Sequence, residues 1–296
     1  MSMKSLLTFI NPASGKKKDK SDIPDFLHNH FHNDDNQLFE LKKGTSKSEI
    51  EEKIKSQSWD GVIISGGDGT VKLIGECLAG TDIPAVILPM GSANGLATCL
   101  GIYELDDAIS AFKRGKIIHL DKLDVNGESC FHLCDFGFNA GLIKRFHDED
   151  ERGMVSYFKA SLRQFFDVRP YRFELKTRDS HWEAEAKMLV VANGDKFGTG
   201  AVINPKGKLD DGRMEVICLN PESFEDLAAL SLHLFRGTLH ESDLAKIWSV
   251  KEIEIINSDE AEFHIDGEVK ETTRNVNISC LSKQVKFYSL RGLKAQ

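Results

Sequence analysis

The segment Ser65-Gly66-Gly67-Asp68-Gly69-Thr70 places one carboxylate among three glycines, between an apolar run and a helical pattern. Glycines let the backbone approach phosphate oxygens without a Cβ clash, and the free N–H groups of a following helix attract anions. A carboxylate in such a loop would repel phosphate unless it binds Mg²⁺ or accepts a proton. We therefore interpret Asp68 as a residue for phosphate chemistry, with a purely conformational turn as the alternative.

Two further loops have the same placement after an apolar run. They are Asn11-Pro12-Ala13-Ser14-Gly15, which a basic run over 16–20 follows, and Pro89-Met90-Gly91-Ser92-Ala93-Asn94-Gly95. Each offers small residues, a hydroxyl and an amide donor, although each alone is compatible with a simple turn. Ligands of parallel sheets bind outside the carboxyl ends of the strands. Three such loops therefore predict one phosphate-binding edge, although the standard P-loop and dinucleotide motifs are absent.

The elements that must position these loops alternate between strand and helix in the first third of the chain. The strands are predicted at 6–10, 38–41, 61–65 and 85–88, and the helices at 23–31, 46–56, 71–78 and 93–100. The pair Ser46 and Glu49 is a capping box at the start of one helix. Strands that are apolar throughout, alternating with helices, predict a parallel sheet covered on both faces.

After about residue 122 the pattern changes to short apolar runs separated by turn signals. These signals are Asn126-Gly127, Asn193-Gly194, Asp211-Gly212 and Asp266-Gly267, and they are typical of antiparallel hairpins. Helical patterns interrupt the runs at 154–166 and 223–235. No Pro- or Ser-rich linker separates the halves, so we expect two domains with a shared interface.

Composition limits the classes of function. The chain has 296 residues, with 38 Lys and Arg against 46 Asp and Glu, a net charge of −8. An acidic chain lacks the clustered cations that nucleic-acid phosphates need, so we expect no nucleic-acid partner. No apolar stretch reaches the roughly 18–20 residues of a membrane span, and the first apolar run is too short for a secretory signal. We predict a cytoplasmic protein with reduced cysteines.

Metal-ligand and hydrolase patterns are weaker. His28 and His32 supply only two facing ligands, fewer than a zinc site needs. The segment Cys130-Phe131-His132-Leu133-Cys134 alternates like one strand face, with no second ligand pair nearby. No G-x-S-x-G nucleophile elbow occurs.

The loops N-P-A-S-G, G-G-D-G-T and P-M-G-S-A-N, in this order, resemble the catalytic domain of the diacylglycerol kinase and sphingosine kinase superfamily. The segments 190–194 (V-V-A-N-G), 209–214 (L-D-D-G-R-M) and 265–268 (I-D-G-E) resemble its second domain. The likeness spans nearly the whole chain and is strongest to soluble bacterial lipid kinases. It implies an α/β domain with a doubly wound parallel sheet, like that of NAD kinase and phosphofructokinase, followed by a β-sandwich. The predicted domains are 1–122 plus 281–296 and 123–280, with the C-terminal strand at about 285–290 returning to the first domain.

The resemblance also implies an ATP site between the two domains, Mg²⁺ dependence, and phosphorylation of a lipid hydroxyl. Nucleotide contacts are implied for Asn11, Pro12, Ala13, Ser14, Gly15, Thr45, Gly66, Gly67, Asp68, Gly69, Thr70 and Ser92. The implied catalytic carboxylates, near Mg²⁺ and the acceptor hydroxyl, are Asp68, Asp266 and Glu268. Asp68 and Glu268 both remain open as the proton acceptor. A structural Mg²⁺ is implied at Asp211 with the carbonyls of Lys208 and Arg213, a plain hairpin turn being the alternative.

Two departures from the family pattern leave the acceptor open. Val71-Lys72-Leu73 replaces the Asn-Glu pair that usually follows G-G-D-G-T, and the third loop lacks the Asp usual in bacterial members. The alternatives are a kinase of a soluble acceptor such as NAD, and an inactive homologue that binds nucleotide or lipid.

The lipid acceptor requires an apolar surface. The segment 157–173 interleaves aromatic with basic residues, as a helix on a membrane surface would, and a core-facing helix is the alternative. The segment 136–141 is a second candidate pocket wall with the same alternative. We expect transient peripheral contact with the inner face of the membrane. The oligomeric state stays open, with a homodimer among the alternatives.

Overall fold

The computed structural model describes residues 5–14, 23–31, 36–137 and 169–292. The chain divides into two compact units: the first comprises Met1–Lys122 and Ser282–Gln296, and the second Leu123–Leu281. The predicted helix at 154–166, most of the segment 157–173, and the basic run 16–20 lie outside the described residues.

A parallel sheet with the strand order β2-β1-β3-β4 forms the centre of the first unit. Its strands are β1 (Leu6–Ile10), β2 (Gln37–Glu40), β3 (Gly61–Gly66) and β4 (Ala85–Pro89). Their parallel direction puts all four carboxyl ends at one edge of the sheet, where the loops of interest begin. The apolar side chains of β1, β3 and β4 are buried, except for the half-buried Ile10 and Pro89 at the strand ends, as expected of strands with both faces covered.

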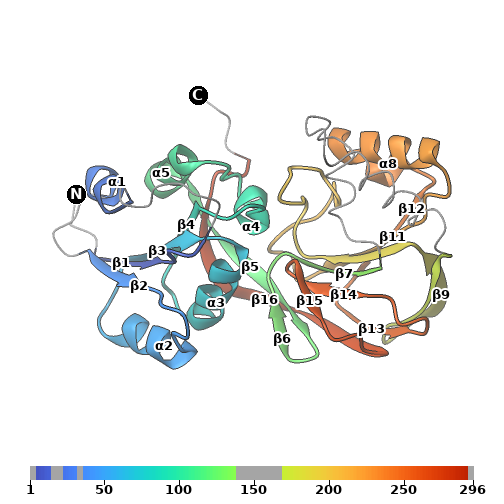
Figure 1. The fold of residues 1–296 in the computed structure, drawn as a ribbon, viewed down its shortest axis with the longest axis horizontal. Helices are drawn as coiled ribbons and strands as arrows, with labels where there is room; N and C mark the ends of the chain where they lie inside the picture. Colours follow the sequence, from blue (N-terminus) through green and yellow to red (C-terminus); the bar gives the residue numbers. More distant parts are fainter. Residues whose placement is uncertain (1–4, 15–22, 32–35, 138–168, 293–296) are drawn as a thin grey trace. The chain divides into compact units, whose positions relative to one another are not determined.

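Helices cover both faces of this sheet, with α1 and α5 on one side and α2 and α3 on the other (Figure 1). The helices are α1 (Ile23–His30), α2 (Lys47–Lys55), α3 (Asp68–Leu78), α4 (Gly95–Cys99) and α5 (Leu105–Arg114). Helix α2 begins at the predicted capping box, in which Ser46 Oγ accepts from Glu49 N and Glu49 Oε1 accepts from Ser46 N. Helix α3 begins at Asp68, three residues before the predicted start, because Gly67 takes the N-cap position.

The second unit is an antiparallel sandwich. Strands β5 (Lys116–Val125) and β16 (Asn275–Ser289) cross the boundaries between the units. The strands wholly within the second unit are β6 (Glu128–Cys130), β7 (Leu133–Gly137), β8 (Tyr171–Lys176), β9 (His181–Ala186), β10 (Met188–Ala192), β11 (Met214–Leu219), β12 (Ala245–Val250), β13 (Glu252–Asn257), β14 (Phe263–Ile265) and β15 (Glu268–Lys270). One sheet has six strands in the order β12-β11-β10-β7-β14-β15, and the other contains the run β16-β13-β8-β9.

Two apolar clusters hold the sandwich together. Between the sheets, the ring of Phe136 stacks on Phe263 with centroids 4.5 Å apart and meets Phe173 at 5.8 Å. Helix α8 (Phe224–Arg236) packs Leu230 and Leu234 in a second cluster with strands β10 and β11 of the six-stranded sheet. Strands β10 and β11 therefore bury apolar residues on both faces, one face in each cluster.

Strand β16 connects the chain back to the parallel sheet. Its first residues pair antiparallel with β13, and its Phe287 pairs parallel with Ala85 of β4. The predicted fold class is confirmed: a helix-covered parallel sheet, then an antiparallel β-sandwich, with the C-terminal strand joining the first sheet.

The four predicted hairpin turns divide into two kinds. Asn126-Gly127 and Asp266-Gly267 are two-residue hairpin turns, joining β5 to β6 and β14 to β15, with positive φ at both residues as a type I′ turn requires. The prediction is wrong for Asn193-Gly194 and Asp211-Gly212, which lie in the long connection between β10 and β11. Among the described residues, no helix combines the length and apolarity that crossing a bilayer would require.

Candidate active site

The loops predicted to bind phosphate all start at the carboxyl edge of the parallel sheet. Asn11 N donates to Ser65 O at 2.9 Å, and Met90 N donates to Gly66 O at 3.0 Å. These bonds extend the strand pairing of β1, β3 and β4 by one residue, so the three loops begin side by side.

Hydrogen bonds join the first loop to the start of α3. Asn11 Nδ2 donates to Thr70 Oγ1 at 2.8 Å, and Ser14 Oγ lies 3.4 Å from the same hydroxyl. Gly67 N donates to Ser14 Oγ at 3.4 Å. Within the loop, Ala13 N donates to Asn11 Oδ1 at 2.9 Å. Asn11, Ser14 and Thr70, which lie far apart in the sequence, therefore form one polar cluster.

The second and third loops touch backbone to backbone. A Cβ on Gly67 would lie 2.9 Å from Gly91 Cα, and a Cβ on Gly91 would lie 2.6 Å from Gly67 Cα. Asn94, in the left-handed region at φ 54°, accepts from Gly91 N at 2.8 Å and donates to Gly91 O at 2.9 Å. Asn94 thus closes its own loop, and the glycines permit a contact that any side chain would prevent.

Asp68 is the first residue of α3, and its side chain is half-buried. The N-cap, Gly67, provides no side-chain hydrogen bond, and the first intrahelical bond is Val71 N to Gly67 O at 3.0 Å. The N–H groups of Asp68, Gly69 and Thr70 precede that bond at the positive end of the helix dipole. The arrangement therefore combines anion-attracting amides with one carboxylate.

The other predicted nucleotide contacts occupy the same edge of the sheet. Thr45 follows β2, and its Oγ1 accepts from Lys42 N at 2.9 Å. Pro12, Ala13 and Ser92 are exposed. Gly15 lies outside the described residues.

In the second unit, Asp266 accepts hydrogen bonds on both carboxylate oxygens. Its Oδ2 accepts from Phe131 N at 3.1 Å, and its Oδ1 accepts from His132 N at 2.9 Å and from Cys130 Sγ at 3.3 Å. The Asp266 side chain therefore fixes the connection between β6 and β7 to the β14–β15 hairpin. This is the geometry of a structural carboxylate.

We expect Asp266→Ala to lower the free energy of unfolding by roughly 2–4 kcal/mol. The change leaves two backbone N–H groups without their acceptor and puts a Cβ without a polar side chain at φ 50°. Urea unfolding gives the measurement, and the exposed Glu268→Gln serves as the control with a change within about 0.5 kcal/mol. An Asp266→Ala protein as stable as the parent would contradict the structural role.

Glu268 is the first residue of β15, and its side chain is exposed. Its Oε2 accepts from Lys270 Nζ at 3.1 Å, and Lys270 also contacts Glu128 Oε1 at 2.7 Å. The hydrogen bond from Lys270 to Glu128 is the main cause that raises the pKa of the Lys270 amine. Glu268 thus has a cationic neighbour and remains accessible to a substrate hydroxyl.

The predicted structural Mg²⁺ loop precedes β11. Asp211 is exposed, with its Oδ1 accepting from Arg213 N at 3.1 Å, and Arg213 Nε donates to Ser249 Oγ at 2.8 Å. Ser249 in turn donates to Glu215, whose carboxyl pKa is raised by burial. Within the part of the chain that the structure describes, no three His, Cys, Asp or Glu side chains form a metal-binding group. The Asp211 site stays a prediction that depends on the backbone carbonyls of Lys208 and Arg213.

A histidine lies between two carboxylates in the second unit. His264 Nδ1 is 3.1 Å from Asp135 Oδ1, and His264 Nε2 is 2.9 Å from Glu262 Oε1. The Asp135 and His264 side chains are 3% and 2% exposed, whereas the Glu262 side chain is 61% exposed. The hydrogen bond to Asp135 raises the pKa of the His264 imidazole, and burial opposes this effect.

Because its folded pKa is raised, His264 stabilises the protein fully below the unfolded value of about 6.5, and this contribution disappears as pH rises through the folded value. We therefore expect the difference in unfolding free energy between the parent and Asp135→Asn to shrink as pH rises from 6 to 9. Urea unfolding of both proteins at intervals of half a pH unit measures this difference in free energy. If the unfolding free energies of the two proteins changed in parallel with pH, the raised pKa of His264 would not arise from its bond to Asp135.

Sequence reasoning did not select Asp135 or His264, and it used Asn193 only as a turn signal and as part of a family motif. The Asn193 side chain is buried, with Nδ2 donating to Phe131 O at 2.9 Å, so it supports the same connection that Asp266 holds. A single charged residue inside an apolar strand, as at Asp135, is a signal that could have been used, because isolated charges are rarely buried. Its partner could not have been identified, since 129 residues separate it from His264.

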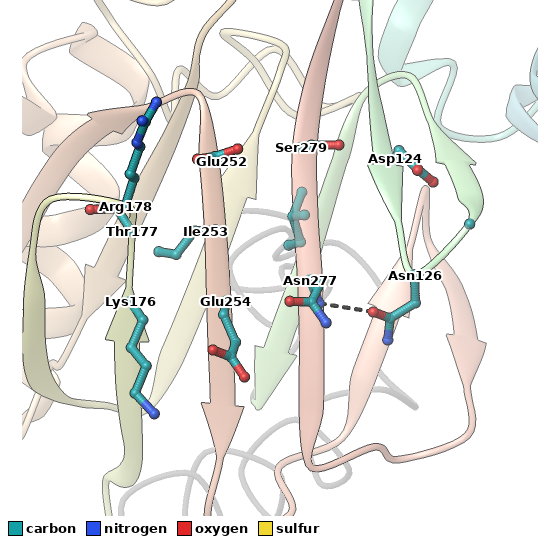
Figure 2. A pocket seen from close by; sticks show the side chains of 12 residues that line it. Asp124, Asn126, Lys176, Thr177, Arg178, Glu252, Ile253, Glu254, Asn277 and Ser279 are labelled. Atoms are coloured by element: carbon teal, nitrogen blue, oxygen red, sulfur yellow. Dashed lines mark hydrogen bonds between the residues drawn. The ribbon is translucent and has the colours of Figure 1, made fainter.

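A polar hollow of about 550 Å³ lies in the second unit, apart from all the predicted site residues (Figure 2). Among the residues that line it, Asn277 N donates to Asn126 Oδ1 at 2.8 Å. Charges of both signs line it, namely Lys176 and Arg178 with Asp124, Glu252 and Glu254. Such a mixed lining selects no particular ligand, and we assign none.

Comparison with known families explains this arrangement. Residues 5–125 match the diacylglycerol kinase catalytic domain, and residues 135–287 match the YegS C-terminal NAD kinase beta sandwich-like domain. The chain belongs to the family that combines a diacylglycerol kinase catalytic domain with a YegS C-terminal domain. The resemblance predicted from the sequence motifs is confirmed, and the two matched regions of this kinase family follow one another along the chain.

Individual relatives support the same family. Lipid kinase YegS of Escherichia coli K12 is 33% identical over 163 residues, which are 52% of this chain and 54% of that protein. YegS of Shigella boydii serotype 18 gives the same values. The aligned part thus spans about half the length of the curated relatives. The crystal structure of a diacylglycerol kinase from Bacillus anthracis str. Sterne shares the fold, with a TM-score of 0.74 and 19% identity over 99% of this chain and 100% of that one.

Proposed function

We propose that the protein is an ATP- and Mg²⁺-dependent kinase that transfers the γ-phosphoryl group to a hydroxyl of a membrane lipid. The observation that carries the proposal is the start of α3, where Asp68 follows the N-cap Gly67 at the positive end of the helix and three loops converge. Membership of a family whose curated relatives are named lipid kinases supports the lipid acceptor.

The nucleotide phosphates are proposed to bind at the carboxyl edge of the parallel sheet. The amides of Asp68, Gly69 and Thr70 are proposed as donors, and the Thr45 and Ser92 hydroxyls lie on the loops that follow β2 and β4 at that edge. Phosphoryl transfer requires chiefly correct positioning and stabilisation of charge, so backbone amides held by a rigid loop cluster suit the task.

Asp68 is the residue of this edge that would hold Mg²⁺. Magnesium keeps several waters and binds through one or two carboxylates together with substrate phosphates, so a single half-buried carboxylate beside phosphate-binding amides fits the ion. When bound, Mg²⁺ neutralises charge on the β- and γ-phosphates.

The acceptor hydroxyl must lose its proton as its oxygen bonds to the γ-phosphorus and the bond to the β–γ bridging oxygen breaks, which releases ADP. Asp68 and Glu268 are the candidates for accepting that proton. The Asp266 carboxylate already accepts three hydrogen bonds from the chain, so we propose that it positions the hairpin and takes no proton.

We propose a diacylglycerol or sphingoid-like lipid as the acceptor, reached from the cytoplasm by transient contact with the inner face of the membrane. NAD is the soluble rival, favoured by the likeness of the second region to the β-sandwich of NAD kinase. The two acceptors differ in whether the labelled product extracts into chloroform.

The test is transfer from γ-labelled ATP to diacylglycerol, sphingosine and phosphatidylglycerol in mixed micelles, and to NAD in solution. We expect labelled lipid, lost when EDTA removes divalent ions. Transfer to NAD alone would replace the lipid acceptor, and nucleotide binding without transfer to any acceptor would support an inactive binding protein.

A further inference from the structure

The hairpin that carries Glu268 is built on a very short strand. Strand β14 has three residues, Phe263–Ile265, between β7 on one side and β15 on the other. In its register His264 faces Asp135 of β7 and Val269 of β15, and Ile265 faces Glu268. A strand this short forms few ladder hydrogen bonds, so the backbone alone specifies its register weakly.

A bond between buried side chains also holds β14 against β7. Asp135 and His264 are directly opposite one another across the β7–β14 pair, and their side chains meet at 3.1 Å in a buried position. An ionised carboxylate only accepts hydrogen bonds, so a histidine with a carboxylate oxygen at each ring nitrogen donates from both. His264 is then an imidazolium, and its bonds to Asp135 and Glu262 are charge-assisted.

A slip of β14 by one residue would be costly because of this pair. The side chains of a strand alternate between its two faces, so a slip turns His264 away from Asp135 and leaves a buried carboxylate without its partner. The same slip would move Glu268, which faces the last residue of β14 across the two-residue turn. Phe263 and Ile265 bury the other face of β14 in the core, and Asp266 holds the turn that follows, so the pair adds to a register that these residues also favour.

We propose that Asp135 and His264 are positioning residues that hold the β14–β15 hairpin, and with it Glu268, in the place needed for phosphoryl transfer. The kinetic part of this inference rests on the proposed function, whereas the anchoring part does not. Neither residue is proposed to touch substrate, since both side chains are buried.

The experiment compares three variants of the full chain with the parent. Asp135→Leu/His264→Leu removes both charges together, and apolar replacement of a whole buried pair often leaves stability unchanged. His264→Asn keeps a donor that can reach Asp135. His181→Leu is the matched control, since His181 is an exposed histidine of the same unit, 3.7 Å from a carboxylate oxygen of Glu174.

Two readouts are needed. Hydrogen exchange of peptides covering 262–272 reports how firmly the hairpin is held, and labelled-ATP transfer gives kcat and KM. For the double leucine variant we expect about tenfold faster exchange in the hairpin and a kcat about 10- to 100-fold lower, with KM for ATP unchanged. We expect His264→Asn to retain most of both properties, and His181→Leu to match the parent.

Hairpin exchange at the parental rate in the double leucine variant would overturn the anchoring. Faster exchange with an unchanged kcat would overturn the positioning of Glu268. Should the double variant not fold, Asp135→Asn takes its place, because it keeps the shape of the side chain. Hairpin exchange and kcat are then measured for that variant. Absence of transfer by the parent itself would instead refute the proposed function, a result that the exchange data separate from a failure of the anchor.

Discussion

Asp68→Asn is expected to lower kcat for phosphoryl transfer by about 10²- to 10⁴-fold, the range typical for loss of a general base. Asn has nearly the same shape, but it neither accepts the hydroxyl proton nor offers Mg²⁺ a full negative charge. Loss of the negative charge in the first turn of α3 costs only about 0.3–1 kcal/mol, so α3 should keep its position at the sheet edge. Steady-state transfer of labelled phosphate measures the effect, and circular dichroism checks the fold.

Glu268→Gln is the matched comparison, because it makes the same change of carboxylate to amide in the second unit. A collapse of kcat in one variant and a modest loss in the other would identify the proton acceptor. A Mg²⁺ role for Asp68 would appear separately, as weaker Mg²⁺-dependent ATP binding by Asp68→Asn. Near-normal turnover in Asp68→Asn would remove this residue from the mechanism.

Gly91→Ala is the second change with a large expected effect. The new Cβ would lie 2.6 Å from Gly67 Cα and 2.8 Å from Asn94 Oδ1, distances that no real Cβ contact shows. Since the obstacle at Gly67 is backbone, the second and third loops must separate. We expect ATP to bind at least about tenfold more weakly, and the free energy of unfolding to fall by about 1–3 kcal/mol.

The control for this change is Gly80→Ala in the same unit. Gly80 has open space around its Cα, and its positive φ of +78° makes alanine cost only backbone strain. Stability should therefore fall in both proteins, but ATP affinity should fall only in Gly91→Ala. Isothermal titration with a nonhydrolysable ATP analogue provides the measurement. Parental affinity in Gly91→Ala would show that contact between the loops is not needed for nucleotide binding.

Local patterns in the sequence predicted the parallel strands and the antiparallel second half with little error, whereas the β-sandwich and the returning C-terminal strand were implied by the family resemblance. Strand β1 has its predicted bounds, and α2 begins at its predicted capping box. These features depend on residues that are neighbours along the chain, since apolar periodicity and helix caps are local effects. The same holds for Asn126-Gly127 and Asp266-Gly267, where two adjacent residues determine the type I′ turn.

Turn residues without paired flanking strands misled the prediction. Asn193-Gly194 has the composition of a hairpin turn, but the Asn193 side chain instead binds Phe131 O, across 62 residues of sequence. Likewise Asn94 closes its own loop, whereas its amide had been counted among the donors offered to a ligand.

The grouping of the phosphate loops followed from the sequence, because parallel strands must bring their carboxyl ends to one edge. The direct contacts between these loops could not be predicted from the sequence. The approach of Gly67 to Gly91 and the bond between Asn11 and Thr70 depend on how the strands pack. The same is true of Asp266 and of the Asp135–His264 pair, whose partners are more than a hundred residues away. Local sequence specifies which residue types stand at a strand end, whereas side chains distant along the chain become partners only when long-range strand pairing places them face to face.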